Sequence, residues 1–375
     1  MPARVSLERL ARLVWVPFAL CTGIVVLWAV IENLTGTVYQ RTLLITLIYL
    51  VLVLGLQMFS GTSGVLSFGH VAFMAIGAYV SALLTIPPEL KKATYLQMPG
   101  FLHWVLDTEF GTLEATLVGG GFAMGFGIIF AAPIVRLRGV QAGIGTLAIL
   151  VVVYVFNVQT VSITNGVSTT IGVPSTTTMT SALVWTLIVI VAAYLFQQSR
   201  RGLRLRATRE NERAARSVGV SVPFERGVAW VLSTFVAGIA GALYGHFIVA
   251  FSPTSFYFGI TFLTIAMLVV GGMTSVSGAV VGCIFLATVQ EALRRFEVNG
   301  LGPLDPGDVP SGTTSLGLAL VLLLTLILRP KGITGGKEIP WPGDWSLPRR
   351  RAPAPAQVAP PSPEPAKSAE TARTE

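Results

Sequence analysis

Residues 42–60 read TLLITLIYLVLVLGLQMFS, and no position in this stretch carries a charged side chain. A helix of roughly 20 apolar residues crosses the hydrocarbon core of a bilayer. The whole chain of 375 residues is 53% hydrophobic and only 12% charged, whereas a soluble domain carries about 25% charged residues. These features predict an all-α polytopic membrane protein.

Apolar segments of this kind follow one another along most of the chain. Two of them, 258–272 and 314–329, are short, so we expect about ten transmembrane helices, within a range of eight to ten. No stretch between the segments has room for a water-soluble domain. The segments are 14–33, 42–60, 65–86, 113–135, 140–158, 181–198, 227–250, 258–272, 277–293 and 314–329.

The first segment has the outline of a signal peptide, because a basic head precedes an apolar run. Arg4, Arg9 and Arg12 form that head, but no small-x-small cleavage site follows the run. We therefore expect an uncleaved first span. Cys21 and Cys283 both lie inside predicted spans, where they are expected to fill space as small apolar residues.

Lysine and arginine are unevenly distributed when ten spans are threaded with the N-terminus inside. The inner side receives three at the N-terminus, Arg136 and Arg138, eight within 199–226 and eight after residue 328. The outer side receives five, which are Arg41, Lys91, Lys92, Arg294 and Arg295. Cytoplasmic loops carry an excess of basic residues, so we expect both termini in the cytoplasm. A basic face beside anionic lipid explains the charge without a nucleic-acid partner, although Arg294 and Arg295 fit the scheme poorly.

The remaining segments complete the expected organisation. Residues 87–112 and 159–180 are expected outside, the first along the membrane interface and the second as an uncharged polar loop. Residues 1–340 form the predicted transmembrane domain. Residues 341–375 are rich in Pro and Ala with mixed charge, a composition that cannot bury a core. They are predicted to form a disordered cytoplasmic tail.

Residues 199–220 read SRRGLRLRATRENERAARSVGV and hold seven arginines. Treated as a helix over 204–218, the segment places Arg206, Arg209, Arg213 and Arg216 on one stripe. Small or uncharged residues cluster on nearly the opposite face: Ala207, Asn211, Ala214, Ala215 and Val218. Glu212 precedes Arg216 by four residues, the favoured order for an ion pair. Two interpretations stay open: arginines that only contact lipid phosphates, or a small-residue face that seats against another protein.

This segment resembles the cytoplasmic coupling segment of the branched-chain amino-acid ABC permeases, the LivH/LivM family, and within it the LivM type. Other stretches resemble the family in the same order: GVLSFGHVAFMAIGAY (64–79), LRGVQAGIGTLAI (137–149), VLSTFVAGIAGALYGHF (231–247), SPTSFYF (252–258), VVGGMTSVSGAVVG (269–282) and LILRPKGI (326–333). The chain departs from the family at Val65, which replaces a glutamine, and in ITNGVSTTIGVP (163–174). There Asn165 replaces a glycine, and Val167-Ser168-Thr169 replaces Pro-Asn-Gly.

The resemblance implies the ABC importer permease fold and an assembly in the plasma (inner) membrane. The implied partners are a second, LivH-like permease subunit, two cytoplasmic ABC ATPases and an extracytoplasmic substrate-binding protein. The chain itself is expected to be no enzyme and to need no cofactor or metal. The residues expected to contact the ATPase are Arg206, Ala207, Arg209, Glu210, Asn211, Ala214, Ala215 and Gly219.

Two Gly/Ser-rich stretches, 60–69 and 271–278, are expected to interrupt helices. Paired breaks in a transporter indicate a substrate site, because unwound backbone offers N–H and C=O groups. Tight loops at the cytoplasmic edge are the equally open alternative. The residues proposed for a substrate path are Ser67, Gly69, His70, Gly271, Gly272 and Ser275.

We expect the histidines and glycines within the spans to have structural roles, in hydrogen bonding and in helix packing. His70 and His246 are expected to be neutral and hydrogen-bonded between helices, and His103 lies in an outer loop. No second ligand stands at helical spacing from any of them, so no metal site is predicted. Three G-x-x-x-G pairs are expected to pack helices closely: Gly121/Gly125, Gly241/Gly245 and Gly278/Gly282.

The sequence thus predicts a permease subunit that translocates branched-chain amino acids and performs no chemistry. A urea or short-amide permease of the same family is the nearest alternative. An ion-coupled transporter is expected to bury several carboxylates, which these spans lack, and a membrane-bound enzyme would need an acid, base or metal set. GITGGKE (332–338) has the wrong glycine spacing for a phosphate-binding loop.

Overall fold

Long apolar helices make up most of the chain in the computed structural model, which describes residues 2–34, 36–95, 98–299 and 312–340. The predicted tail, 341–375, lies outside the described residues. Eight helices in this part of the chain are long and apolar enough to cross a membrane. They are α1 (Pro2–Leu34), α2 (Thr37–Leu56, continued by the π-helix η1, Gln57–Gly61), α6 (Thr112–Ile134), α7 (Gly139–Gln159), α9 (Met179–Gln198), α12 (Val222–Ile248), α13 (Phe258–Gly271, preceded by η3, Pro253–Phe256) and α14 (Val276–Asn299).

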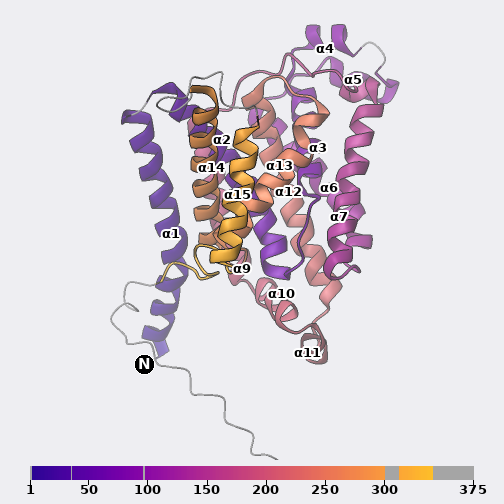
Figure 1. The fold of residues 1–375 in the computed structure, drawn as a ribbon. Helices are drawn as coiled ribbons and strands as arrows, with labels where there is room; N and C mark the ends of the chain where they lie inside the picture. The colour runs from indigo at the N-terminus through magenta and orange to yellow at the C-terminus, as the bar shows by residue number, and fades with distance from the viewer. Residues whose placement is uncertain (1, 35, 96–97, 300–311, 341–375) are drawn as a thin grey trace, which may run out of the picture. The chain divides into compact units, whose positions relative to one another are not determined.

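Two shorter helices account for the other predicted spans. α3 (His70–Thr85) is bent by 116° from α4 (Pro88–Thr94), and the pair counts as a ninth candidate span. α15 (Thr313–Leu328) has 16 residues, about 24 Å at 1.5 Å per residue. The helices run side by side in Figure 1. The prediction of eight to ten transmembrane helices is confirmed.

The third predicted span starts later than expected. Residues 64–69 are not helical, and Gly64 has a φ of +73° that favours glycine. Side-chain hydroxyls replace the helical partners of this backbone: Ser63 accepts from Val65 N, Ser67 from Gly69 N, and Thr146 of α7 from Phe68 N. Backbone outside a helix is tolerated at membrane depth only when protein groups satisfy it. The predicted break at 60–69 is confirmed for residues 64–69 only, since residues 60–63 are still helical, and it delays the next helix to His70.

Glycines bring α3, α6 and α12 into close contact. A Cβ on Gly241 would lie 1.8 Å from Met74 O, and one on Gly77 would lie 2.1 Å from Gly238 O. Gly278 and Gly282 similarly face the backbone of α13 and the loop after it. The predicted pair Gly121/Gly125 packs against no other helix within the described part of this chain, because no atom there lies within 4 Å of a Cβ at either position. Neighbouring glycines on another face of α6, Gly119, Gly120 and Gly127, make its contacts instead.

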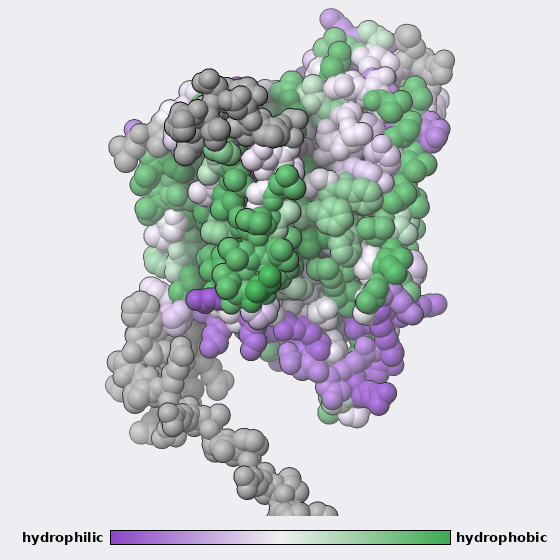
Figure 2. Space-filling model, in the orientation of Figure 1, coloured by the Kyte–Doolittle hydropathy of each residue, from purple (hydrophilic) through white to green (hydrophobic). Residues whose placement is uncertain are grey.

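The outer surface of the helices is apolar, and one end of them is strongly basic. Figure 2 shows apolar side chains across the middle of the visible face and a hydrophilic cluster at the end where α10 (Arg200–Glu210) and α11 (Glu212–Ser217) lie. Exposed apolar residues include Phe122 and Ile129 of α6 and Leu320 of α15. We call the end with α10 and α11 the basic end. The opposite end carries α4 and α5 (His103–Leu106), which η2 (Gly100–Leu102) directly precedes.

Candidate functional site

The basic end presents two short helices where one was predicted over 204–218. Ser199 caps the start of α10, because its Oγ accepts from Gly202 N at 3.2 Å, and the helix ends at Glu210. Asn211 then adopts an extended conformation (φ −153°, ψ 103°), and its Oδ1 accepts from Ala214 N at 3.0 Å. Asn is a strong N-cap residue, so it starts a second helix. The prediction of one continuous helix is wrong for this reason.

The residues predicted to contact an ATPase divide into an exposed group and an inward group. Ala207, Glu210, Asn211, Ala214 and Gly219 are exposed, together with Arg213 and Val218. Arg206 and Arg209 are half-buried, and Ala215 is buried at 4% exposure. The exposed group mixes small and polar side chains at the tip of the protein. We call Ala207, Glu210, Asn211, Arg213, Ala214, Val218 and Gly219 the exposed tip.

Glu212 fastens α11 to the rest of the basic end. Its carboxylate pairs with Arg216 at 2.7 Å within α11, which confirms the predicted ion pair. It also contacts Arg138, which precedes α7, at 3.1 Å and the buried Arg226 of α12 at 3.2 Å. Carboxylates that hold several guanidinium groups are geometrically specific. α11 is therefore fixed to two other segments rather than projecting freely.

Arg209 connects α10 to the break between α2 and α3. Its Nη1 donates to Gly61 O, the last residue of η1, at 2.9 Å. The aliphatic part of the same side chain covers Gly64, where a Cβ would lie 2.6 Å from Arg209 Cγ. The first helix break therefore rests directly on the helix that leads to the exposed tip.

A polar network around Gln197, at the end of α9, connects α10 to both breaks. Gln197 O accepts from Arg206 Nη2 at 2.8 Å, and Gln197 Oε1 accepts from Gln57 Nε2 of η1 at 3.2 Å. Gln197 Nε2 donates to Glu338 Oε1 at 3.0 Å. The carboxylate of Glu338 also accepts from Val276 N and Ser277 N, at 2.8 and 3.0 Å, where α14 begins. Five segments meet at this network: α9, α10, η1, the start of α14 and the segment that holds Glu338.

Residues 329–339 form a strap over the second break. Ile333 N donates to Val270 O at 2.8 Å, and Thr334 Oγ1 donates to Gly271 O at 2.8 Å. Gly272, with a φ of +117°, lies against Thr334 and Gly332. The predicted path residues Gly271, Gly272 and Ser275 therefore lie in a turn covered by this strap. Sequence inspection missed Gln57, Gln197 and Glu338; uncharged polar residues inside apolar spans were the available signal for the two glutamines.

The other predicted path residues are held in the same part of the protein. Both ring nitrogens of His70 are hydrogen-bonded at 2.9 Å, one to Ser67 and one to Ser233 of α12. Gly69 lies against α7, because a Cβ on this glycine would come within 2.6 Å of Thr146 O. The two breaks meet where Gly61 approaches Met273 O, since a Cβ there would come within 2.2 Å of it. The structure thus brings the breaks together beside α10.

His246 is likewise bonded on both sides, to Ser81 of α3 at 2.8 Å and to Pro174 O at 3.0 Å. His103 bonds to Met98 O at 2.9 Å. Within the described ranges, no group of three His, Cys, Asp or Glu residues could hold a metal ion.

A family model described as "Branched-chain amino acid transport system / permease component" matches residues 38–328. The chain belongs to this permease family. The LivM permease protein of the high-affinity branched-chain amino acid transport system of Escherichia coli (strain K12) is 29% identical over 332 residues, which cover 80% of this chain and 70% of LivM. The LivH permease protein of the same strain is 25% identical over 311 residues, covering 78% and 92%. The nucleoside ABC transporter permease protein NupC of Lactococcus lactis subsp. cremoris (strain MG1363) is 25% identical over 141 residues, covering 38% and 43%. No solved structure matches the chain.

The permease keeps its divergent loop, 163–174, ordered by local chemistry. Asn165 adopts the left-handed conformation with a φ of 62°, which Asn tolerates better than most residues. Thr170 then pairs with Phe251 through two backbone hydrogen bonds of 2.8 and 3.2 Å. The replacement of glycine by asparagine is therefore compatible with the turn that this position makes.

Proposed function

We propose that the chain is the membrane-spanning permease subunit of an ATP-driven importer of branched-chain amino acids. The observation that carries the proposal is the exposed tip, which is joined by Arg206 and Arg209 to both helix breaks. A cytoplasmic ATPase that moves the tip would act on both breaks at once. The family membership supports the substrate class, since LivM and LivH are described as branched-chain amino acid permease proteins.

The proposed mechanism is alternating access with no chemistry on this chain. An external binding protein delivers the substrate, a second permease subunit completes the path, and two ATPases close on ATP. Ala207, Ala214 and Gly219 are the small residues of the exposed tip, beside the longer Glu210 and Arg213. Arg209 transmits the motion to Gly61, and Arg206 transmits it to Gln197 and the strap.

The proposed orientation places the basic end in the cytoplasm of a prokaryotic cell. The arginines of α10 and α11 lie at this end, together with Arg138, which pairs with Glu212 of α11, as the positive-inside rule requires. Both termini are then cytoplasmic, and the protein is a multi-pass component of the plasma (inner) membrane. The unwound residues 64–69 and the turn at 271–275 are the proposed contributions to the substrate path, because their backbone is not committed to helices.

A urea or short-amide importer of the same family is the second candidate, because the divergent loop 163–174 weakens the assignment of the usual substrate. A related protein, NupC, is described as a nucleoside permease, which is a different substrate class from that of LivM and LivH. The two candidate solutes need different contacts along the substrate path, because one is a zwitterion with an apolar side chain and the other is a small neutral amide. Competition between the two solutes therefore separates the candidates.

The test is purification of the assembled complex in detergent, identification of the ATPases and binding protein that co-purify, and uptake assays in proteoliposomes. Leucine, isoleucine or valine uptake should require ATP and should stop when a non-hydrolysable ATP analogue replaces it. Uptake of urea that excess leucine does not reduce would favour the second candidate. Isolation of a folded chain that transports leucine without any ATPase would reject the importer assignment.

A further inference from the structure

Three of the five basic residues at the opposite end converge on one place. Lys91 is buried and donates to three backbone carbonyls, and Lys92 pairs with Asp107 at 2.6 Å. The remaining three are Arg41 at the start of α2 and Arg294 and Arg295 near the end of α14. Charges within transmembrane segments are costly and mark functional sites by default. The orientation of the protein in the membrane therefore does not by itself explain why these three arginines lie here.

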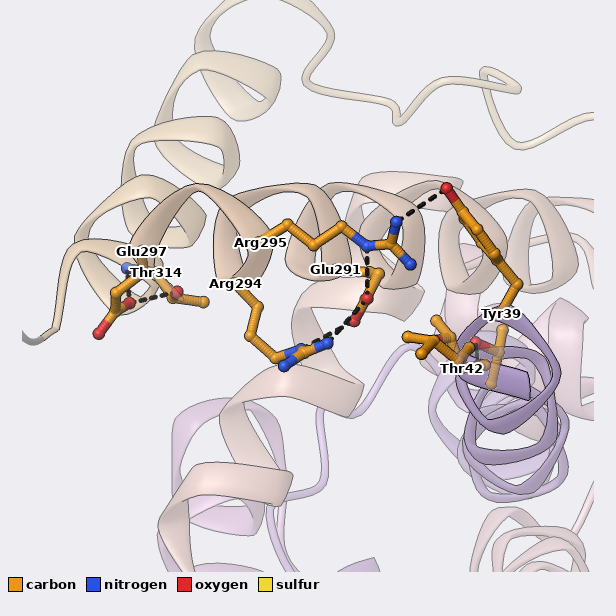
Figure 3. Close-up of polar contacts among 9 residues, drawn as sticks. Tyr39, Thr42, Glu291, Arg294, Arg295, Glu297 and Thr314 are labelled. Atoms are coloured by element: carbon orange, nitrogen blue, oxygen red, sulfur yellow. Dashed lines mark hydrogen bonds and ion pairs between the residues drawn. The ribbon is translucent and has the colours of Figure 1, made fainter. Parts of the chain in front are cut away.

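Glu291 organises the two arginines of α14, as Figure 3 shows. Arg294 donates to both carboxylate oxygens at 2.9 Å, and Arg295 Nε donates to Oε1 at 2.8 Å. Arg295 also donates to the Tyr39 hydroxyl at 2.8 Å and lies 4.1 Å from the centre of its ring. Oε2 of Glu291 accepts only one of these bonds, which leaves it a lone pair for another donor.

Arg41 lies across a cavity from this pair. The cavity has a volume of about 390 Å³ and lies between α2, α14 and the end of α12. Glu291, Arg294 and Arg41 line its polar side, and Val38, Ile45 and Phe247 are among its apolar lining. The side chain of Arg41 makes no hydrogen bond or ion pair with any residue in the described part of the chain. The lining of this cavity thus holds two guanidinium groups and one carboxylate, and Arg295 pairs with the same carboxylate from outside the lining. Arg41 also lines a second cavity together with Glu32.

We propose that this cavity binds an aliphatic α-amino acid on its way to the path, an inference that rests on the proposed function. The substrate carboxylate would lie between Arg41 and Arg294, since guanidinium groups bind carboxylates with two parallel hydrogen bonds. The ammonium group would donate to Oε2 of Glu291, and the aliphatic side chain would pack on Val38, Ile45 and Phe247. The volume falls within the range of small-molecule pockets, about 300–1,000 Å³.

The same chemistry, an anionic group joined to an apolar chain, is also offered by an anionic lipid. The experiment therefore uses the full-length chain in nanodiscs of phosphatidylcholine alone or with added phosphatidylglycerol. A thiol reporter, Val38→Cys, is introduced after Cys21→Ser and Cys283→Ala, and its alkylation rate by a maleimide is measured. Leucine should slow alkylation in both lipid compositions, whereas leucinol, which lacks the carboxylate, should have little effect.

Variants then test the two arginines. Arg41→Gln and Arg294→Gln should each raise the leucine concentration needed for half-protection by about tenfold or more, because each removes a charge-assisted hydrogen bond. Arg294→Lys should restore part of the affinity. Lys92→Gln is the matched control, since it neutralises another outer cation outside the cavity, and it should match the parent chain.

Three results would overturn the proposal. They are leucine protection that the arginine variants do not change, protection by leucinol equal to that by leucine, and alkylation that responds to phosphatidylglycerol but not to leucine. Uptake by the full complex distinguishes failure of the proposed cavity site from failure of the proposed importer function. Leucine uptake without protection rejects the site alone, and protection without ATP-dependent uptake rejects the importer alone.

Discussion

Gly241 of α12 offers the sharpest test of how this bundle is held together. A Cβ at this position would lie 1.8 Å from Met74 O, 2.7 Å from Met74 C and 3.0 Å from Ala78 N. All three atoms are backbone of α3, so no side chain can move aside. Gly241→Ala must therefore push α12 away from α3 by more than about 1 Å, and gaps of 0.5–1 Å forfeit a quarter to a half of each dispersion contact.

Overpacking a well-packed core costs about 1–3 kcal/mol, occasionally more. We expect Gly241→Ala to lower the free energy of unfolding by an amount at or above the upper end of this range, about 3 kcal/mol. The reason is that the nearby contact between Gly77 and Gly238 would be lost together with the contact at Gly241. The free energy of unfolding can be measured by titrating the purified full-length chain from mild detergent into dodecyl sulfate. Thermal stability, read as the fraction that stays monodisperse after heating, gives a second measure.

Gly125→Ala is the matched control, because this glycine also lies in an apolar helix and in a G-x-x-x-G pair. No atom of the described residues lies within 4 Å of its Cβ position, and Ala exceeds Gly in helix propensity by about 1 kcal/mol. The control should leave the stability unchanged or raise it slightly. A Gly241→Ala chain as stable as the wild type, or a Gly125→Ala chain that is destabilised equally, would refute the packing argument.

Four further predictions concern the coupling network, the orientation and the tail. Ala214→Trp at the exposed tip should reduce co-purification of the ATPases and uncouple ATP hydrolysis from uptake. Ala93→Trp, at an exposed alanine of the opposite end, should have neither effect. Equal losses in the two variants would reject docking of the ATPases at the tip. Glu338→Gln should lower the free energy of unfolding by about 1–3 kcal/mol, because charged hydrogen bonds to the start of α14 and to Gln197 are weakened, while the exposed Glu89→Gln should change it little. In whole cells, with Cys21 and Cys283 replaced, Thr169→Cys should react with an impermeant thiol reagent and Ser217→Cys should not, and the reverse pattern would invert the orientation. Deletion of 345–375 should leave assembly and uptake nearly intact, because the Pro/Ala-rich composition buries no core, and loss of the complex would contradict this.

Much of the architecture could be predicted because the bilayer imposes a simple requirement on each segment separately. The uncharged run at 42–60 becomes a helix wherever it is placed in lipid, and its neighbours obey the same rule. The family resemblance and the ion pair between Glu212 and Arg216 were also predictable, since both depend on residues close in the chain. The break at Asn211 was a local effect that helical periodicity hid, because the side chain caps a new helix.

The sequence by itself determined which segments are helical, which end is basic and to which family the chain belongs. Only the tertiary structure decided which face of each helix packs. In α6, Gly119 and Gly127 face neighbouring helices, whereas Gly125 is exposed. Arg206 and Arg209 point toward the other helices of the bundle. The tertiary structure also joined Gln57, Gln197 and Glu338, which lie 140 and 141 residues apart along the chain. The physical reason is that lipid accepts any apolar face of a helix, so the rotation of each helix is set by close packing and polar contacts with distant segments.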